Sequence, residues 1–283
     1  MLKAFQSRLS RDILVESAII CIVGLTSLAW FRGNTLIEWK DWIFPLSNEA
    51  VNRSFEVSTY AWDGIVTGLG IQSHILFPTV IYHFFLWMFS HLGFSMPIIS
   101  KALFYFLFTL SGLSMYYLML NIVDRKWTLA RVGGALFYMM NPFSMVFVWG
   151  DIMTSFIFSY AIVPLVIALY IRAIKNKGTV KQAFIISILW TLVGSNNANP
   201  EITLIIWLFL FAYLLFAAVS SKNIQHAYRS VRFTLVLLLI FIGTNAFWMV
   251  SSGYFVGETF QRISREWFGD SDIGLQLWAH CSL

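Results

Sequence analysis

Long apolar runs separated by short polar turns dominate this sequence. About 20 apolar residues cross the hydrocarbon core of a bilayer as a helix, and runs near that length recur at 13–31, 73–91, 98–121, 130–149, 152–171, 183–198, 202–219 and 232–250. The exception in the first half is the long polar stretch 32–72. The pattern predicts an all-α polytopic membrane protein with one transmembrane domain over residues 1–283, about eight hydrophobic segments and a long first loop.

Composition agrees with a membrane class. Hydrophobic residues make up 58% of the chain and charged residues 12%, whereas soluble domains carry about 25% charged residues. The net charge of +5 does not suggest nucleic acid, because the basic residues lie in short loops between apolar runs. Segment 13–31 exceeds the apolar core of a typical signal peptide, which favours an uncleaved span over a cleaved leader.

The basic residues predict the orientation of the chain. Most of the 19 Lys and Arg residues fall into four short clusters: Lys3, Arg8 and Arg11; Arg125, Lys126 and Arg131; Arg172, Lys175, Lys177 and Lys181; Lys222, Arg229 and Arg232. The positive-inside rule places all four clusters, and the N-terminus, in the cytoplasm of a multi-pass protein of the cell membrane. The second cluster would then be external if 73–91 crossed fully. We therefore expect 73–91, which contains Pro78 and three histidines, to be an interfacial or re-entrant helix.

The same orientation places the remaining polar segments on the external face. These segments are the loop 32–72, the turns near Asp151 and at 194–201, and the tail after 250. Within the loop, 47–62 is predicted to form a surface helix, capped by Ser47 or Asn48, with one face lying on the membrane. That face carries Val51, Phe55 and Trp62.

Two further features concern the spans. Asn141-Pro142 is expected to end or kink the helix of 130–149, since proline removes a backbone donor and clashes with the preceding turn. Glu16 lies near the start of the first span, where we expect its carboxylate to reach the interface.

Acidic and amide side chains on the external face suggest chemistry. Asp41 and Asp151 lie at or near span ends, where two carboxylates can bind a divalent metal or one can act as a general base. The simpler alternative is that both face water. Asn197 and Glu201 suit sugar hydroxyls, although Asn199 and Pro200 also form a complete helix cap.

The order of these features resembles a known enzyme superfamily. A first span, an external loop with an acid followed by FP, the segment KALFYFLFTLSGLSMYYLML, a basic turn, and ARVGGALFYMMNPF before Asp151 are similar to the N-terminal membrane part of GT-C glycosyltransferases. The closest likeness is to the archaeal and actinobacterial proteins related to α-(1→3)-arabinofuranosyltransferases. It covers about residues 10–210 and implies a GT-C-like helical bundle whose first external loop carries short surface helices.

The resemblance also implies a function and roles for residues. GT-C enzymes transfer a sugar from a polyprenyl-phosphate donor to an acceptor on the external face. By position, Asp41 is the expected catalytic base, with Glu38 in reserve, and Asp151 joins Asp41 at a site for Mg²⁺ or Mn²⁺. Lys40 and Arg53 are expected at the donor phosphate. The polar turn with Asn197 and Glu201 is expected near the acceptor.

The chain departs from its relatives in ways that keep other functions open. Large relatives carry more spans and external domains, so we expect an external domain or subunit beyond this chain, which ends in WAHCSL. One alternative is a transporter or flippase-like protein that binds a lipid or small solute. Another is a non-catalytic membrane subunit that scaffolds an external partner.

Overall fold

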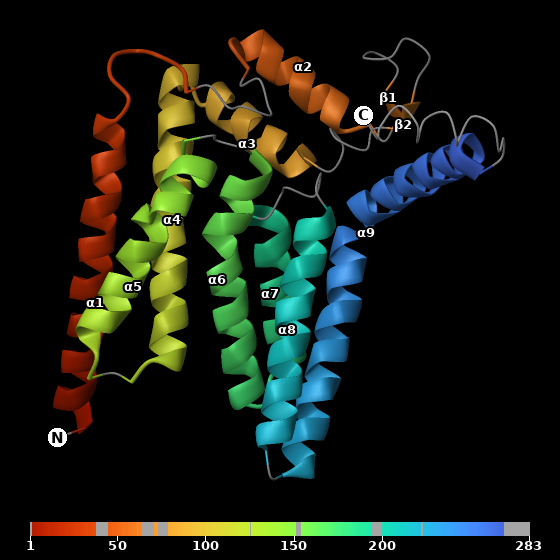
Figure 1. Ribbon diagram of the computed structural model, residues 1–283. Helices are drawn as coiled ribbons and strands as arrows, with labels where there is room; N and C mark the ends of the chain where they lie inside the picture. Colours follow the sequence, from red (N-terminus) through yellow and green to blue (C-terminus); the bar gives the residue numbers. More distant parts are fainter. Residues whose placement is uncertain are drawn as a thin grey trace, which may run out of the picture.

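The chain folds into a bundle of helices with a smaller helical layer across one end (Figure 1). The computed structural model describes residues 2–37, 45–60, 62–63, 71–72, 79–124, 126–150, 154–193, 200–221 and 223–268. Its helices are α1 (Leu2–Leu25), the 3₁₀ turn η1 (Thr26–Ala29), α2 (Asn48–Ser58), α3 (Val80–His91), α4 (Met96–Ile122), α5 (Thr128–Met140), the π-helix η3 (Ser144–Val148), α6 (Thr154–Lys175), α7 (Val180–Val193), α8 (Pro200–Ser220) and α9 (Ile224–Phe268). Strands β1 (Trp62–Asp63) and β2 (Ile71–Gln72) form one short antiparallel pair.

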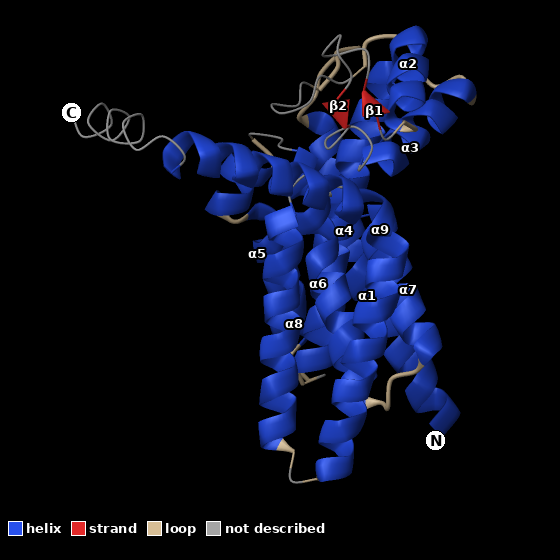
Figure 2. Ribbon diagram, turned by 90° about the vertical axis from the view of Figure 1, so that its right-hand side faces the viewer, coloured by secondary structure: helices blue, strands red, loops and turns tan. Residues whose placement is uncertain are grey.

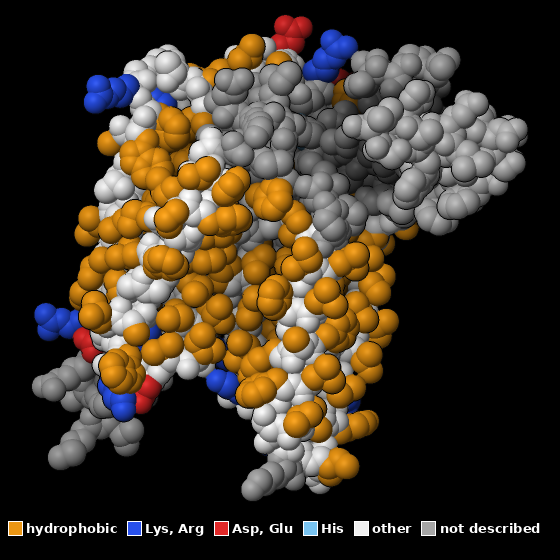
Figure 3. Space-filling view, in the orientation of Figure 1, with side chains coloured by type: hydrophobic (Ala, Val, Ile, Leu, Met, Phe, Trp, Pro, Cys, Tyr) orange, Lys and Arg blue, Asp and Glu red, His pale blue; other side chains and the backbone are white. Residues whose placement is uncertain are grey.

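Five of the described helices are long and apolar enough to cross a membrane. The crossing segments are Arg11–Ala29, Met96–Ile122, Phe156–Lys175, Ile202–Ser220 and Ile224–Val250. The shorter helices α5 and α7 have 13 and 14 residues and run beside them (Figure 1). On the face shown in Figure 3, hydrophobic side chains cover the sides of the bundle and charged side chains gather toward its ends. The predicted all-α polytopic membrane fold is confirmed.

The basic connections share one end of the bundle. The start of α1 and the α4–α5, α6–α7 and α8–α9 connections lie at the bottom of Figure 1. Two hydrogen bonds hold neighbouring helices together there: Arg172 Nη1 donates to the Tyr117 hydroxyl over 2.6 Å, and Lys175 Nζ to the Asn121 carbonyl over 2.8 Å. The grouping of the basic clusters at one end, predicted from their spacing, agrees with this arrangement.

Helix α3 does not cross the bundle. It has 12 residues, about 18 Å of helix, which is short of the roughly 30 Å of a hydrocarbon core. It lies with α2 across the end opposite the basic connections (Figures 1 and 2). Gly93, at φ +87°, ends α3 with a turn in which the Phe94 amide donates to the Phe89 carbonyl. The described part of 73–91 is therefore an end-lying helix, as the distribution of basic residues predicted.

Helix α2 forms within the predicted range 47–62 but ends at Ser58, so Trp62, which was expected on its apolar face, lies instead in β1. The helix contacts protein. The Ser47 hydroxyl accepts a hydrogen bond from the Ala50 amide over 3.1 Å, which satisfies a free donor of the first turn. Val51 is only 1% exposed, and Phe55 packs on the rings of Phe84 and Trp87 in α3. The expected membrane-lying face is thus a protein contact, because α3 offers the apolar partner.

The predicted span 130–149 consists of two pieces. Helix α5 ends at Met140 and Asn141 adopts an extended conformation, φ −68° and ψ 158°, as a residue before proline prefers. The Asn141 amide group donates to the Phe137 and Tyr138 carbonyls. The π-helix η3 then carries the chain to Trp149. The break expected at Asn141-Pro142 is confirmed.

The helices pack around two hydrophobic cores. One core joins α1, α3, α4, α5 and the first turns of α6, and the other joins the rest of α6 with α7, α8 and α9. Helix α6 therefore belongs to both. We call these the first and second halves of the bundle.

The structure gives Glu16 a buried protein partner that the sequence did not indicate. The residue is 4% exposed, and its carboxylate accepts from Arg131 Nη2 over 2.7 Å. The Tyr116 hydroxyl donates to the same carboxylate, also over 2.7 Å. Burial of both charges is tolerated because each has its partner, and the pair joins α1 to α5 across α4.

Candidate functional site

Most of the site residues predicted from sequence lie outside the described residues. This holds for Glu38, Lys40, Asp41, Asp151 and Asn197. Glu201 follows Pro200 in the first turn of α8, as the capping pattern predicts, and Arg53 is exposed on α2. The described segments next to these positions show which parts of the chain lie together.

Two of these flanking segments converge on one stretch of α4. Trp30 immediately precedes the loop 32–72, and Trp149 lies two residues before Asp151. Both rings pack edge-on against Phe108, each with a centroid distance of 5.1 Å, and both also contact Phe104. The described segments that precede the first loop and Asp151 therefore lie next to each other on α4.

The α5–α6 corner is held by reciprocal aromatic hydrogen bonds. Tyr138 and Tyr160 stack with their ring centroids 4.1 Å apart, and each hydroxyl donates to the backbone carbonyl of the other residue. The indole N–H of Trp149 donates to the Met139 carbonyl over 2.9 Å. The Tyr138 and Met139 carbonyls are freed by the end of α5, and the Tyr160 carbonyl by Pro164, which has no N–H to donate within α6.

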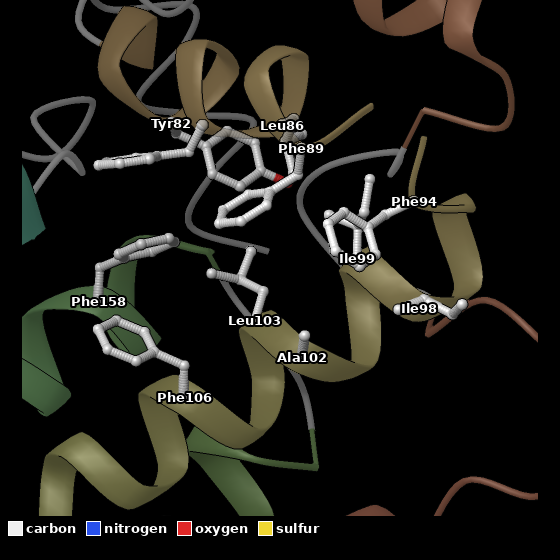
Figure 4. Close-up of a pocket in the computed structure, with 11 residues that line it drawn as sticks. Tyr82, Leu86, Phe89, Phe94, Ile98, Ile99, Ala102, Leu103, Phe106 and Phe158 are labelled. Carbon is white, nitrogen blue, oxygen red and sulfur yellow. The ribbon is translucent and has the colours of Figure 1, made fainter. Parts of the chain in front are cut away.

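An apolar pocket of about 410 Å³ lies beneath α3. It is lined by α3, the turn after it, the first three turns of α4, and Phe158 of α6 (Figure 4). Five of its lining residues are phenylalanines, and Tyr82 is the one lining residue with a polar side-chain atom. A volume of this size is typical of a small-molecule site, and its lining suits a hydrocarbon.

Buried titratable groups lie beside this pocket on α3. Burial raises the pKa of the Tyr82 hydroxyl and lowers the pKa of His83 to about 4, because a charged form loses hydration inside the protein. The two rings contact each other with centroids 5.2 Å apart. His83 is therefore neutral at physiological pH, and no sequence pattern distinguished it from the other two histidines of this segment.

Two basic side chains at the α2–α3 end of the bundle, Lys101 and Arg53, differ in their surroundings. Lys101 Nζ donates to the Gly33 carbonyl, which ties the start of the first loop to α4. Arg53 is left facing solvent on α2. Over the residues that the structure describes, no three His, Cys, Asp or Glu side chains group as metal ligands. The metal ligands predicted from sequence, Asp41 and Asp151, lie outside that part of the chain.

The architecture and the comparisons together define the class. The bundle is that of a multi-pass α-helical membrane protein whose helices contact lipid. A family profile described as a family of unknown function (DUF6541) matches residues 77–277. That is well over half of the chain, and the protein belongs to this family. No curated protein and no solved structure matches it.

The family match bears on the resemblance to GT-C enzymes. It includes Asp151, Asn197 and Glu201 but begins after the loop that holds Glu38 and Asp41. The comparisons assign no glycosyltransferase family to the chain.

Proposed function

We propose that the protein is the membrane part of a glycosyltransferase that uses a polyprenyl-phosphate-linked sugar. The observation that carries this proposal is the convergence of Trp30 and Trp149 on Phe108. It brings together the chain segments that lead into the two candidate acids, Asp41 and Asp151. A reaction between a lipid-linked donor and an acceptor needs such groups gathered at one end of a bundle, level with the lipid headgroups.

The distribution of charge supports the side of the membrane. The basic connections lie at the end opposite α2 and α3 (Figure 1), and the positive-inside rule assigns that basic end to the cytoplasm. The site then opens on the external face. An acceptor reaches it from outside, and the donor reaches it from within the bilayer.

The proposed chemistry assigns one role to each candidate residue. Asp41 takes the proton of the acceptor hydroxyl while the oxygen of that hydroxyl bonds to the anomeric carbon of the sugar. Glu38 is the second candidate for this general base. The bond from that carbon to the donor phosphate breaks, and the phosphate oxygen keeps the electron pair. Lys40 and Arg53 balance this negative charge.

A divalent ion fits the same acids by its chemistry. Mg²⁺ and Mn²⁺ prefer carboxylate oxygens, and Asp41 and Asp151 would provide them. A bound ion would neutralise charge on the leaving phosphate. Asn197 and Glu201 are proposed to hydrogen-bond the acceptor.

The transport alternative is less well supported by the second half. A transporter needs polar groups facing a water-filled path between helices. The hydroxyl and amide groups of α7 and α9 instead bond one another: Asn245 Nδ2 donates to Thr191 Oγ1 over 2.9 Å, and the Ser187 and Thr244 hydroxyls are 2.6 Å apart. These contacts hold helices together.

The test is transfer activity in membranes that contain the full chain. Labelled polyprenyl-phosphate pentoses and hexoses are supplied, and transfer to membrane-bound or soluble acceptors is followed. Asp41→Asn is expected to lower transfer by at least 100-fold, the usual effect of losing a general base. Asp151→Asn is expected to lower transfer by removing a carboxylate ligand of the divalent ion. Glu49→Gln, an exposed acid on α2, is the matched control. Unchanged transfer in both variants rejects the assigned roles, and co-purification of a stoichiometric partner without transfer favours the scaffold alternative.

A further inference from the structure

The pocket beneath α3 has an open side at the exposed residues of α4. Ile98 and Phe106 are 53% and 52% exposed, whereas Leu86, Ile99 and Phe158 are at most 5% exposed. In Figure 4 the side chains from α3 and α4 face each other across the space, with Phe158 and Phe106 at one end and Phe94 and Ile98 at the other. A ligand therefore enters past the exposed residues of α4.

The opening faces lipid. Ile98 and Phe106 belong to the crossing segment Met96–Ile122, and the pocket walls offer rings and aliphatic carbon to whatever enters. Water gains nothing by filling such a space, because a buried water needs two to four polar partners. A hydrocarbon chain from the bilayer exchanges one apolar environment for another and gains contacts with the rings.

One wall of the pocket belongs to the start of α6. Phe158 is in the first turns of α6, a helix that starts at Thr154, directly after the turn of Asp151. Tyr82 packs against Phe158 with ring centroids 5.8 Å apart and adjoins the buried ring of His83. A chain seated in the pocket thus lies between α3 and the first turns of α6.

We propose that this pocket binds the first isoprene units of the polyprenyl chain of the lipid-linked donor, which enters sideways from the bilayer between α3 and α4. The identity of the occupant rests on the proposed function. The location and the hydrocarbon nature of the site rest on the pocket itself.

The site can be tested by filling it. Ala102 is the smallest lining residue, and Ala102→Trp puts an indole ring into the space that the chain would take. Ala18→Trp is the matched control, because Ala18 is exposed on α1 and does not line the pocket. Ile98→Trp is a second filling variant at the open side, where folding tolerates a larger ring.

Binding is measured without transfer. The purified full chain in nanodiscs is titrated with undecaprenyl phosphate, with phosphatidylglycerol as competitor, and retained lipid is quantified by native mass spectrometry. We expect Ala102→Trp and Ile98→Trp to weaken retention of undecaprenyl phosphate by tenfold or more, while Ala18→Trp equals the wild type. Monodisperse elution and an unchanged melting temperature establish that a filled variant is folded.

Three outcomes overturn the inference. Equal retention by wild type and both filled variants places the chain elsewhere and leaves the proposed transfer reaction standing. Displacement by equimolar phosphatidylglycerol makes the pocket an ordinary phospholipid site. No retention by the wild type removes the site altogether. Loss of transfer in Asp41→Asn with retention intact separates the reaction from lipid binding.

Discussion

The two halves of the bundle are held together by different chemistry. The first half joins α1, α4 and α5 through the buried Glu16–Arg131 ion pair. The second half joins its helices through neutral hydrogen bonds, such as Asn245 to Thr191 and Tyr170 to Thr234. A buried ion pair demands one register of the helices, because a misplaced charge has no partner in lipid. A misplaced neutral hydrogen-bonding group loses less free energy than a misplaced charge.

The halves also differ in how their helices are arranged. In the second half α7, α8 and α9 run alongside α6, and Trp190, Trp207 and Phe241 pack against one another. In the first half α3 lies across the end of the bundle and leaves the pocket beneath it. A helix that crosses others at their ends cannot fill the space below it as a parallel neighbour does. The first half therefore contains both the buried ion pair and this pocket.

The largest effect is expected from breaking the ion pair. Glu16→Ala leaves the Arg131 guanidinium buried without its carboxylate and is expected to cost about 3 kcal/mol of stability. Thermal unfolding of the detergent-purified protein measures the loss. Adding Arg131→Met should recover part of it, whereas Asp12→Ala, an exposed acid on α1, should change little. An equal loss for Asp12→Ala and Glu16→Ala would contradict a specific role for the pair.

Acid should weaken the first half through His83. Burial lowers the pKa of His83 to about 4 from 6.5, so between these values the unfolded chain binds a proton that the folded chain does not. Stability therefore rises with pH across this window and is lost as pH falls through it, by about 3 kcal/mol in total. Melting temperatures from pH 7.5 to 4.5 should fall less steeply in His83→Gln. His91→Gln, exposed at the end of α3, is the control, and parallel curves for the wild type and His83→Gln would count against the prediction.

Helix packing should be more sensitive to substitution at Gly112, in the first half, than at Gly243, in the second. A Cβ at Gly112 would lie 2.1 Å from Met139 Sδ and 2.8 Å from a methyl carbon of Ile20, whereas nothing lies within 4 Å of one at Gly243. Gly112→Val is expected to cost about 2 kcal/mol through overpacking. Gly243→Ala should be neutral or slightly stabilising, since alanine favours a helix. Denaturant titration measures the free energy of unfolding of both variants. Equal changes in Gly112→Val and Gly243→Ala would contradict the prediction.

The smallest effect is expected from the neutral network of the second half. Asn245→Ala removes the hydrogen bonds to Thr191 Oγ1 and from the Trp248 indole N–H. Such bonds between membrane helices contribute about 1 kcal/mol. Gln225→Ala, exposed on the same helix, is the matched control. A loss as large as that of Glu16→Ala would remove the distinction between the halves.

Local features of this protein followed directly from its sequence. Apolar runs gave the crossing helices, because hydrocarbon excludes unsatisfied backbone polar groups. The spacing of Lys and Arg put the connections at one end. Ser47 and Asn141-Pro142 set helix boundaries through hydrogen bonds and clashes that reach only a few residues along the chain.

Other features depended on contacts that no local pattern encodes. Glu16 and Arg131 are 115 residues apart in the chain, and each alone has the appearance of an interfacial charge. The face of α2 that carries Val51 was expected to lie on the membrane, but it packs against protein, including α3. The pocket arises from the crossing of α3, α4 and α6, whose lining residues are indistinguishable in sequence from ordinary core phenylalanines.

The sequence by itself thus determined the class of the protein, the order of its helices and the end at which its polar loops gather. Each of these depends on hydrophobicity, charge and backbone preference along a short stretch. Only the tertiary structure decided which charges are buried together, which segments meet at Phe108 and where a cavity remains, because these are set by side chains from distant helices competing for the same space.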